Sequence, residues 1–324
     1  MMVWMERLCV ITNAQASFGH PDQHDIENRE VSFESEARME AALSALVFFN
    51  DGVGVSVPSF DAPLATTEQL ELAHSAAHIA AFFDATDRLS NTTARIEFGE
   101  EIEILASSRA AALSAAGAAI LGVEQVCGGS FAHTFAIVRP PGHHAERSRS
   151  MGFCIFSNAA LAARYARARY QQRVAIIDFD AHRANGTESV VADVDGILLC
   201  DLCIRGDNAY PKTGDDTRRP ARNVVRVELA PDTTGARYLE RFRSVILPRV
   251  REFSPDLLVF SAGFDCLKYD PVGGLELTPR HLRTLVRELL AVCDRSVSLL
   301  EGGYQLNLLG LGVLGHLMAL RENF

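Results

Sequence analysis

Lysine is nearly absent from this chain of 324 residues: Lys212 and Lys268 are the two lysines among 31 basic residues. So strong a preference for arginine, together with frequent alanine, indicates by composition a high-GC genome, for which a bacterial source is expected. The 41 acidic residues give a formal net charge of −10. This sign of charge leaves no electrostatic basis for binding nucleic acid or an anionic membrane.

Targeting segments, linkers and metal-binding cysteine pairs are missing too. The N-terminus has no basic region followed by a long apolar core, and no apolar run reaches membrane-spanning length. No linker or repeat divides the chain, which predicts one domain over residues 1–324. Cys200 and Cys203 form a C-x-x-C, but residues three apart in a strand face opposite sides and no second pair exists. We expect seven reduced core thiols and a soluble, cytoplasmic protein.

Apolar strands alternate with helices along the chain. With 48% hydrophobic residues, this alternation predicts an α/β domain, a mainly parallel sheet with helices on both faces. Residues 13–32, with His20 and His24, are expected to form a long polar loop. The strands are predicted at residues 8–12, 135–138, 174–177, 197–204, 224–229, 257–261 and 297–300, and the main helices at residues 35–49, 107–126, 235–253 and 278–293. Two further helices are predicted, one that begins at the capping residues Thr66 to Gln69 and one that ends near Tyr170.

The stretch R-V-A-I-I-D-F-D-A-H-R-A-N-G-T-E from residue 173 is the most informative. Its apolar run at residues 174–177 is typical of a buried parallel strand. Asp178, Asp180 and His182 follow at alternate positions, which in an extended chain puts all three side chains on one side. They indicate a metal site, although a solvated acidic loop explains this stretch alone equally well.

Other strands end in polar side chains of the same kind. His143 and His144 follow a Pro-Pro-Gly turn, Asp265 follows S-A-G-F, and Tyr304 follows E-G-G. Because parallel strands share one carboxyl edge, these groups should meet there. Asp180, His182 and Asp265 are a suitable ligand set for catalytic zinc, the histidines for proton transfer, and the tyrosine for an oxyanion. The chemistry indicated is metal-assisted hydrolysis of an amide or ester.

Five ordered motifs resemble the zinc-dependent deacetylases, which include histone deacetylases, acetylpolyamine amidohydrolases and bacterial deacetylase-like amidohydrolases. The motifs are R-P-P-G-H-H-A, M-G-F-C-I-F-S-N, D-F-D-A-H-R-A-N-G-T, S-A-G-F-D and E-G-G-Y. The resemblance runs from about Glu34 beyond Tyr304, is greatest to the class II branch, and implies the arginase/deacetylase-like fold.

The resemblance also implies roles for individual residues. Zinc would bind Asp180, His182 and Asp265. His144 would be the general base and then acid, and His143 its electrostatic partner. The residues implied to support them are Asp178 on His143, Asn185 on His144, Tyr304 on the scissile carbonyl, Arg38 behind the site, and Gly152, Phe153 and Tyr210 along a narrow acyl-lysine channel. A structural monovalent cation, K⁺ in the family, would lie near Asp178, Asp180, His182, Asp201 and Leu202.

Several positions depart from the family pattern. Arg183 and Ala184 replace the usual His-Gly, and a positive φ at Ala184 would cost about 1 kcal/mol. Asp201 stands where many relatives have serine, and Lys212 replaces a loop glycine. Relatives that prefer acetylpolyamines carry a glutamate where this chain has Val272, which favours acyl-lysine substrates. The remaining candidates for that carboxylate are Glu27 and Glu30 in the polar loop.

Three functions are compatible with these residues. The favoured one is a zinc deacetylase of an acylated amine, most simply acyl-lysine. An acetylpolyamine or other small-molecule deacetylase or esterase is the second, and a catalytically silent acyl-lysine-binding module is the third. An arginase-like site with two metals is disfavoured, because Ala184 stands where that site has its second aspartate. The oligomeric state stays open.

Overall fold

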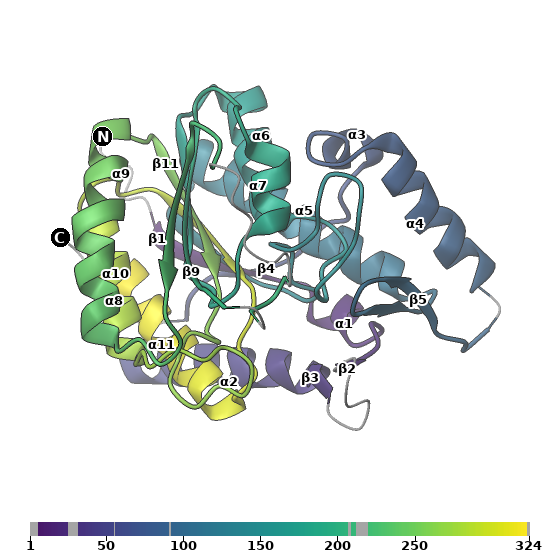
Figure 1. Cartoon of the computed structure of the whole chain (residues 1–324). Helices are drawn as coiled ribbons and strands as arrows, with labels where there is room; N and C mark the ends of the chain where they lie inside the picture. Colours follow the sequence, from purple (N-terminus) through teal and green to yellow (C-terminus); the bar gives the residue numbers. More distant parts are fainter. Residues whose placement is uncertain are drawn as a thin grey trace.

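The computed structural model describes residues 6–24, 32–54, 56–90, 92–206, 209–211 and 220–322. A sheet of eight strands lies between two layers of helices (Figure 1). The strand order is β10-β9-β8-β11-β12-β7-β1-β4, and all neighbours are parallel. The strands are β1 (Glu6–Thr12), β4 (Ser59–Asp61), β7 (Phe131–Ile137), β8 (Val174–Asp178), β9 (Ile197–Ile204), β10 (Val224–Leu229), β11 (Leu257–Ala262) and β12 (Ser296–Leu300).

The central strands are apolar on both faces, as expected for a sheet covered on both sides. Every residue of β7, β8, β11 and β12 is buried. Adjacent residues serve opposite layers: Ile176 belongs to one hydrophobic core and Ile177 to the other. The fold class predicted from the sequence is therefore confirmed.

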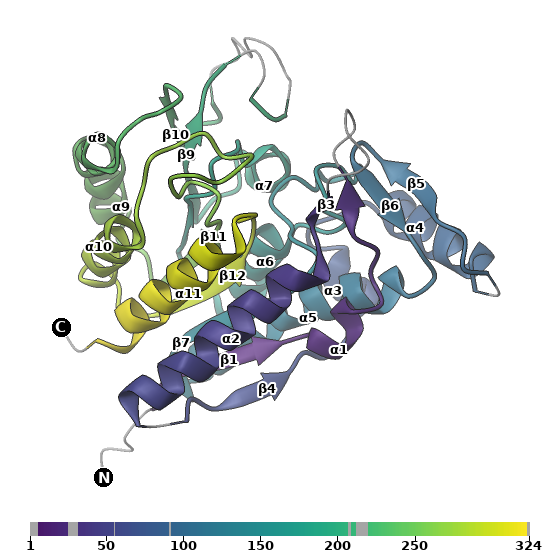
Figure 2. The same ribbon diagram turned by 90° about the horizontal axis from the view of Figure 1, so that it is seen from below.

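One face of the sheet is covered by helices from both ends of the chain, and α2 and α11 lie side by side on it (Figure 2). The helices of this layer are α2 (Glu36–Val53), α8 (Gly235–Arg241), η1 (Phe242–Ile246), α9 (Leu247–Phe253), α10 (Pro279–Leu290) and α11 (Leu306–Arg321). The helices of the opposite layer are α3 (Thr67–Leu70), α4 (Ala76–Arg88), α5 (Ser108–Cys127), α6 (Asn158–Tyr170) and α7 (Asn185–Val191).

Helix α5 qualifies as a membrane span by length and composition, contrary to the expectation that no stretch does. However, 72% of its apolar window is buried inside the fold. The helix packs on β7, β12 and α6, which is the setting of a core helix.

The polar stretch at residues 13–32 is more structured than predicted. It contains α1 (Ala14–Ser17) and β2 (Gln23–His24), and β2 pairs antiparallel with β3 (Ser32–Glu34). A second antiparallel pair joins β5 (Ile96–Gly99) to β6 (Ile102–Ile104). Glu27, Glu30 and Lys212 lie outside the described residues.

The predicted helix at residues 235–253 is interrupted by the π-helical turn η1. This turn ends just before Pro248, which lacks the N–H group that an α-helical bond requires. Helices α4 and α11 are not among the elements predicted from the sequence.

Candidate active site

Three side chains that could bind a metal meet at the carboxyl edge of the sheet. The Nδ1 atom of His182 lies 3.0 Å from Asp180 Oδ1 and 2.9 Å from Asp265 Oδ2. Each residue offers one possible ligand atom, and these three atoms all lie within 4.8 Å of one another. All three side chains are buried. Strand β8 ends at Asp178, so Asp180 and His182 converge through a turn rather than through the strand alternation assumed above.

Backbone N–H groups orient both carboxylates. Gly302 N donates to Asp180 Oδ2 at 2.9 Å, and Ala181 N donates to Asp265 Oδ1 at 2.8 Å. The other oxygen of Asp265 has no well-aligned hydrogen bond within the described chain, and its close polar neighbour is His182 Nδ1 at 2.9 Å. Because a buried carboxylate oxygen needs a partner, this arrangement fits a cation beside Asp265 Oδ2.

Two glycines bring the backbone close to the carboxylates. A Cβ atom at Gly263 would lie 2.2 Å from Asp180 Oδ2, and one at Gly302 would lie 2.5 Å from Asp265 Oδ2. Two carboxylates and one imidazole with space for water are the donor set of a catalytic zinc site. The residues present therefore fit zinc.

The site is strongly polarised. Burial and, secondarily, the nearby Asp180 carboxylate raise the pKa of Asp265 to about 7, although His182 opposes the rise. Burial alone would lower the pKa of His182, but the Asp265 and Asp180 carboxylates raise it to about 10. Two buried carboxylates this close need positive charge between them.

The tandem histidines have different partners. His143 Nδ1 lies 3.3 Å from Asp178 Oδ2, whereas His144 Nδ1 lies 2.8 Å from Asn185 Oδ1. The two ring centroids are 3.9 Å apart. The Asn185 amide nitrogen donates to Glu146 Oε1 at 2.9 Å, which fixes the orientation of the amide.

These partners set the protonation of each ring. Asn185 Oδ1 can only accept, so His144 carries its proton on Nδ1 and its Nε2 has a free lone pair. Burial and the neighbouring His143 and His182 rings hold the pKa of His144 well below its usual value. Burial opposes the charging of His143, but Asp180 and Asp178 raise its pKa well above the usual value. The pair therefore combines a neutral ring with a charged one.

Tyr304 lies at the exit of β12, held through its backbone and its ring. Its N–H donates to Asp270 Oδ2 at 2.7 Å, and the Arg38 guanidinium lies 5.0 Å from its ring centroid. Burial raises the pKa of Tyr304 well above its usual value; Arg38 opposes this rise, and Asp265 adds to it. The phenol therefore stays protonated and able to donate a hydrogen bond.

The predicted channel residues lie beside the histidines. Gly152 has a φ of +54°, and a Cβ atom there would lie 2.6 Å from both His144 Cδ2 and Tyr210 Cε1. The Tyr210 ring packs edge-on against His144 at 4.7 Å, and Phe153 packs against Tyr304 at 6.1 Å. Aromatic rings thus adjoin the tandem histidines.

The fourth predicted channel residue, Val272, is linked to this group less directly. The Asp270 carboxylate accepts hydrogen bonds from the N–H groups of Val272 and Tyr304. The Val272 side chain is half-buried, and its contact with substrate stays a prediction.

The positions predicted to bind a monovalent cation lie at the end of β8, in the turn that follows it, and in β9. Asp178 pairs in register with Asp201, and Leu202 follows it in the buried part of β9. Burial raises the pKa of Asp201 to about 6 although Arg226 opposes the shift. Among the described atoms, Asp201 Oδ1 accepts no hydrogen bond. The cation itself stays a prediction.

The structure shows how Arg183 and Ala184, which depart from the family pattern, are accommodated. Arg183 donates to Glu188 Oε2 at 3.0 Å. Ala184 has φ −77° and ψ 53°, so the position does not require positive φ and the conditional strain does not arise. Alanine is tolerated because the turn into α7 keeps an ordinary negative φ.

Three buried residues of this region received no role from the sequence. Glu301 Oε2 accepts hydrogen bonds from Gly142 N at 2.7 Å and His143 N at 3.1 Å. Glu34 lies between two arginines, and Arg226 lies 3.4 Å from Asp201. Glu301 is part of the E-G-G-Y motif, so the sequence did mark its position. The roles of Glu34 and Arg226 depend on contacts between segments that are distant in the sequence.

Comparisons with known proteins agree with this geometry. A family model described as the histone deacetylase domain matches residues 32–320. Histone deacetylase 15 of Arabidopsis thaliana is 34% identical over 248 residues, which cover 74% of this chain and 44% of that protein. The uncharacterized protein slr0245 of Synechocystis sp. is 40% identical over 182 residues, covering 56% of this chain and 59% of that protein.

Both relatives are thus considerably longer than the segment that this chain matches. Among solved structures, the crystal structure of the HDA15 HD domain is similar with a TM-score of 0.88 and 27% identity. That match covers 98% of this chain and 90% of the other. Since the family model spans most of the sequence, the chain belongs to the histone deacetylase family.

Proposed function

We propose that this protein is a zinc-dependent deacetylase that hydrolyses the acyl amide of an acylated amine, with acyl-lysine as the favoured substrate class. The observation that carries the proposal is the buried Asp180, His182 and Asp265 group beside a neutral His144. Membership of the histone deacetylase family supports the same reaction.

Asp180, His182 and Asp265 would hold the zinc. When bound, zinc supplies Lewis acidity toward the acyl carbonyl and lowers the pKa of water. Asp178 lies outside this ligand set and is directed to His143. A set of three protein ligands would leave a coordination position for water or substrate.

His144 would move the protons of the reaction. Its neutral Nε2 can accept a proton from the attacking water and then return a proton to the departing amine nitrogen. Asn185 keeps the ring in the tautomer that this task requires. The charged His143, held by Asp178, would stabilise the negative charge that builds up on the substrate.

Tyr304 and the neighbouring aromatic rings would orient the acyl group. The protonated phenol can donate a hydrogen bond to the acyl oxygen, where negative charge develops. Phe153, Gly152 and Tyr210 would enclose the methylene chain of an acyl-lysine. Val272 offers no carboxylate to the distant ammonium groups of a polyamine, which favours acyl-lysine.

We also propose a structural K⁺ near Asp201, supported by its buried oxygen without a hydrogen bond. The backbones of Asp178, Asp180, His182 and Leu202 would supply the other ligands. A thermal shift on exchanging K⁺ for a bulky organic cation would test this site without measuring activity.

The deciding experiment compares kcat/KM of the zinc-loaded protein on acetyl-lysine peptides, longer acyl-lysines, acetylspermidine and acetylputrescine. We expect higher values on an acyl-lysine. A tenfold preference for an acetylpolyamine would overturn the acyl-lysine assignment. Binding of acyl-lysine without turnover on any substrate would instead favour the silent binding module.

A further inference from the structure

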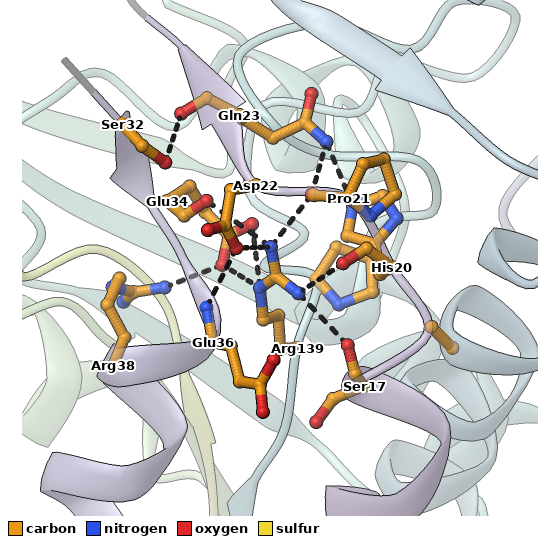
Figure 3. Close-up of polar contacts among 12 residues, drawn as sticks. Ser17, His20, Pro21, Asp22, Gln23, Ser32, Glu34, Glu36, Arg38 and Arg139 are labelled. Carbon is orange, nitrogen blue, oxygen red and sulfur yellow. Dashed lines mark hydrogen bonds and ion pairs between the residues drawn. The ribbon is translucent and has the colours of Figure 1, made fainter. Parts of the chain in front are cut away.

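A buried carboxylate, Glu34, joins two arginines behind the active site (Figure 3). Glu34 Oε1 lies 3.2 Å from Arg38 NH1 and 2.7 Å from Arg139 Nε. Its second oxygen lies 2.9 Å from the same Arg139 nitrogen. The arginines come from α2 and from the exit of β7, so Glu34 connects two distant segments.

Arg38 connects this carboxylate to the loop that carries Tyr304. Its Nε donates to Gly303 O at 2.7 Å, and its NH2 donates to Glu301 O. The same guanidinium lies 5.0 Å from the centre of the Tyr304 ring. Arg38 therefore fixes both the backbone before Tyr304 and one side of its ring.

Arg139 connects Glu34 to the loop that carries the histidines. It stands four residues before His143, and Asn13 accepts from its N–H and donates to its carbonyl. Its guanidinium donates to the carbonyls of Ser17, His20 and Pro21, as Figure 3 shows. Arg139 cannot change its conformation without losing these hydrogen bonds.

The two arginines differ in what else neutralises them. Arg139 also contacts Asp22 at 3.2 Å, and the Asp22 side chain is 43% exposed. Among the described residues, Glu34 is the carboxylate that contacts Arg38. Because a buried guanidinium needs a paired anion, the position of Arg38 depends on Glu34 far more than on Asp22.

We propose that Glu34 is a positioning residue for the deacetylation reaction. It sets the place of Arg38, and through Arg38 the place of the Tyr304 phenol relative to the His143–His144 loop. The inference builds on the proposed function, since it assigns a reason why Tyr304 is aligned for donating a hydrogen bond. The side-chain partners of Glu34 among the described residues are Arg38 and Arg139, and it makes no ion pair with the candidate metal ligands.

The test uses Glu34→Asp, which keeps the charge but shortens the arm that reaches both arginines. We expect kcat to fall about tenfold with KM within about twofold, because small displacements of a positioned group slow the chemical step. In a Tyr304→Phe background the same change should have no further effect on kcat, since the phenol is already gone. Asp22→Asn is the matched control and should leave kcat unchanged.

Glu34→Gln, measured in the same two backgrounds, removes the negative charge but keeps the length of the side chain. Equal slowing by Glu34→Asp with and without the Tyr304 hydroxyl would overturn the proposal, because the residue would then act on general stability. No slowing in the otherwise unaltered protein would also overturn it.

A second measurement does not depend on activity. In protein labelled with ¹³C at tyrosine Cζ, six signals are expected, and Tyr304→Phe identifies one of them. Glu34→Asp should shift the Tyr304 signal and Asp22→Asn should not. An unmoved Tyr304 signal refutes the positioning role. A protein that hydrolyses no acylated amine refutes the proposed function, while the NMR result still decides the role of Glu34.

Discussion

His143 and His144 are chemically identical and differ in the group that faces one ring nitrogen. A carboxylate faces His143 and favours its charged form, whereas an amide oxygen faces His144 and accepts its Nδ1 proton. Two adjacent rings thus take opposite protonation states, which is how acid and base roles are separated in other active sites.

His144→Ala and Tyr304→Phe should each lower kcat by about a hundredfold or more, the usual loss for a proton-transfer group or an oxyanion donor. Both variants should stay folded and retain metal, since neither residue is among the metal-binding group. Steady-state kinetics with zinc analysis of each variant checks this. Near-normal turnover in Tyr304→Phe would contradict the carbonyl-polarising role.

Ala184→Gly should reduce the free energy of unfolding by about 0.5–1 kcal/mol, because glycine gives no relief where φ is already negative. Urea unfolding measures the change. Tyr269→Gly is the contrasting variant, because Tyr269 is exposed and has a φ of +73°. Glycine there should cost nothing or increase stability, and equal losses in both variants would contradict this explanation.

The candidate metal ligands follow two neighbouring strands. Strand β8 pairs with β11, and Asp178 lies opposite Ser261 at the carboxyl edge. The Asp265 loop therefore starts beside the turn that holds Asp180 and His182. A single metal can join the two loops, and losing the ligand after β11 leaves an incomplete set.

Asp265→Ala should abolish stoichiometric zinc binding, whereas the unaltered protein should bind one zinc per chain. Metal analysis after dialysis gives both numbers. Asp270→Asn is a useful control from the same loop, because Asp270 contacts backbone N–H groups and is not in the metal-binding group. Two metals per chain, or full zinc in Asp265→Ala, would exclude the mononuclear site.

Helix α5 depends on a glycine for its approach to the chain after β4. A Cβ atom at Gly117 would lie 1.8 Å from Pro63 O, whereas one at Gly52 in α2 would meet nothing within 4 Å. Gly117→Ala should destabilise the protein by about 1–3 kcal/mol through overpacking. Gly52→Ala should instead stabilise it by about 0.4–1 kcal/mol, and thermal unfolding of both variants checks the contrast.

The sequence predicted the elements whose signals are local. The buried strands β8, β9, β11 and β12 show as apolar runs, and α3 shows its capping residues, Thr66 and Gln69. Helix α11 has little polar alternation, so its helical period is weak in the sequence. The π turn in the helix from Gly235 likewise had no local signal beyond Pro248.

The same distinction applies to the site. Residues within motifs at strand ends could be placed together because parallel strands share an edge. Glu34 and Arg139 are 105 positions apart, and nothing local in either segment indicates that they meet. The sequence left the backbone at Ala184 open, because an alanine at a family glycine position does not show whether the local φ is positive.

Buried neutral histidines make the protein as a whole sensitive to acid. His316 lies among Phe135, Phe179, Phe260 and Phe264, and its Nε2 lies 2.8 Å from Ser298 Oγ. Burial, and secondarily His133, lowers the pKa of His316 to about 3. Burial, and secondarily His78, likewise lowers the pKa of His74 to about 3.

The free energy of unfolding should fall as pH drops from about 6.5 toward 3, because the unfolded chain then binds protons that the folded protein does not. Each such histidine contributes up to about 1.4 kcal/mol per pH unit in this window. In His316→Gln, the slope between pH 6 and 5 should decrease by about that amount. Urea unfolding at each pH measures it, and an unchanged slope would show that His316 is already protonated.

The order of strands in the sheet has a consequence for synthesis of the chain. Strand β12 is the last strand in sequence, yet it lies between β11 and β7. Until residues 296–300 leave the ribosome, β4-β1-β7 and β11-β8-β9-β10 can form only as separate sheets, each with an unpaired inner edge. Such edges invite pairing with other chains. Chains arrested before this strand should therefore aggregate or depend on chaperones, even though most of their sequence is already made.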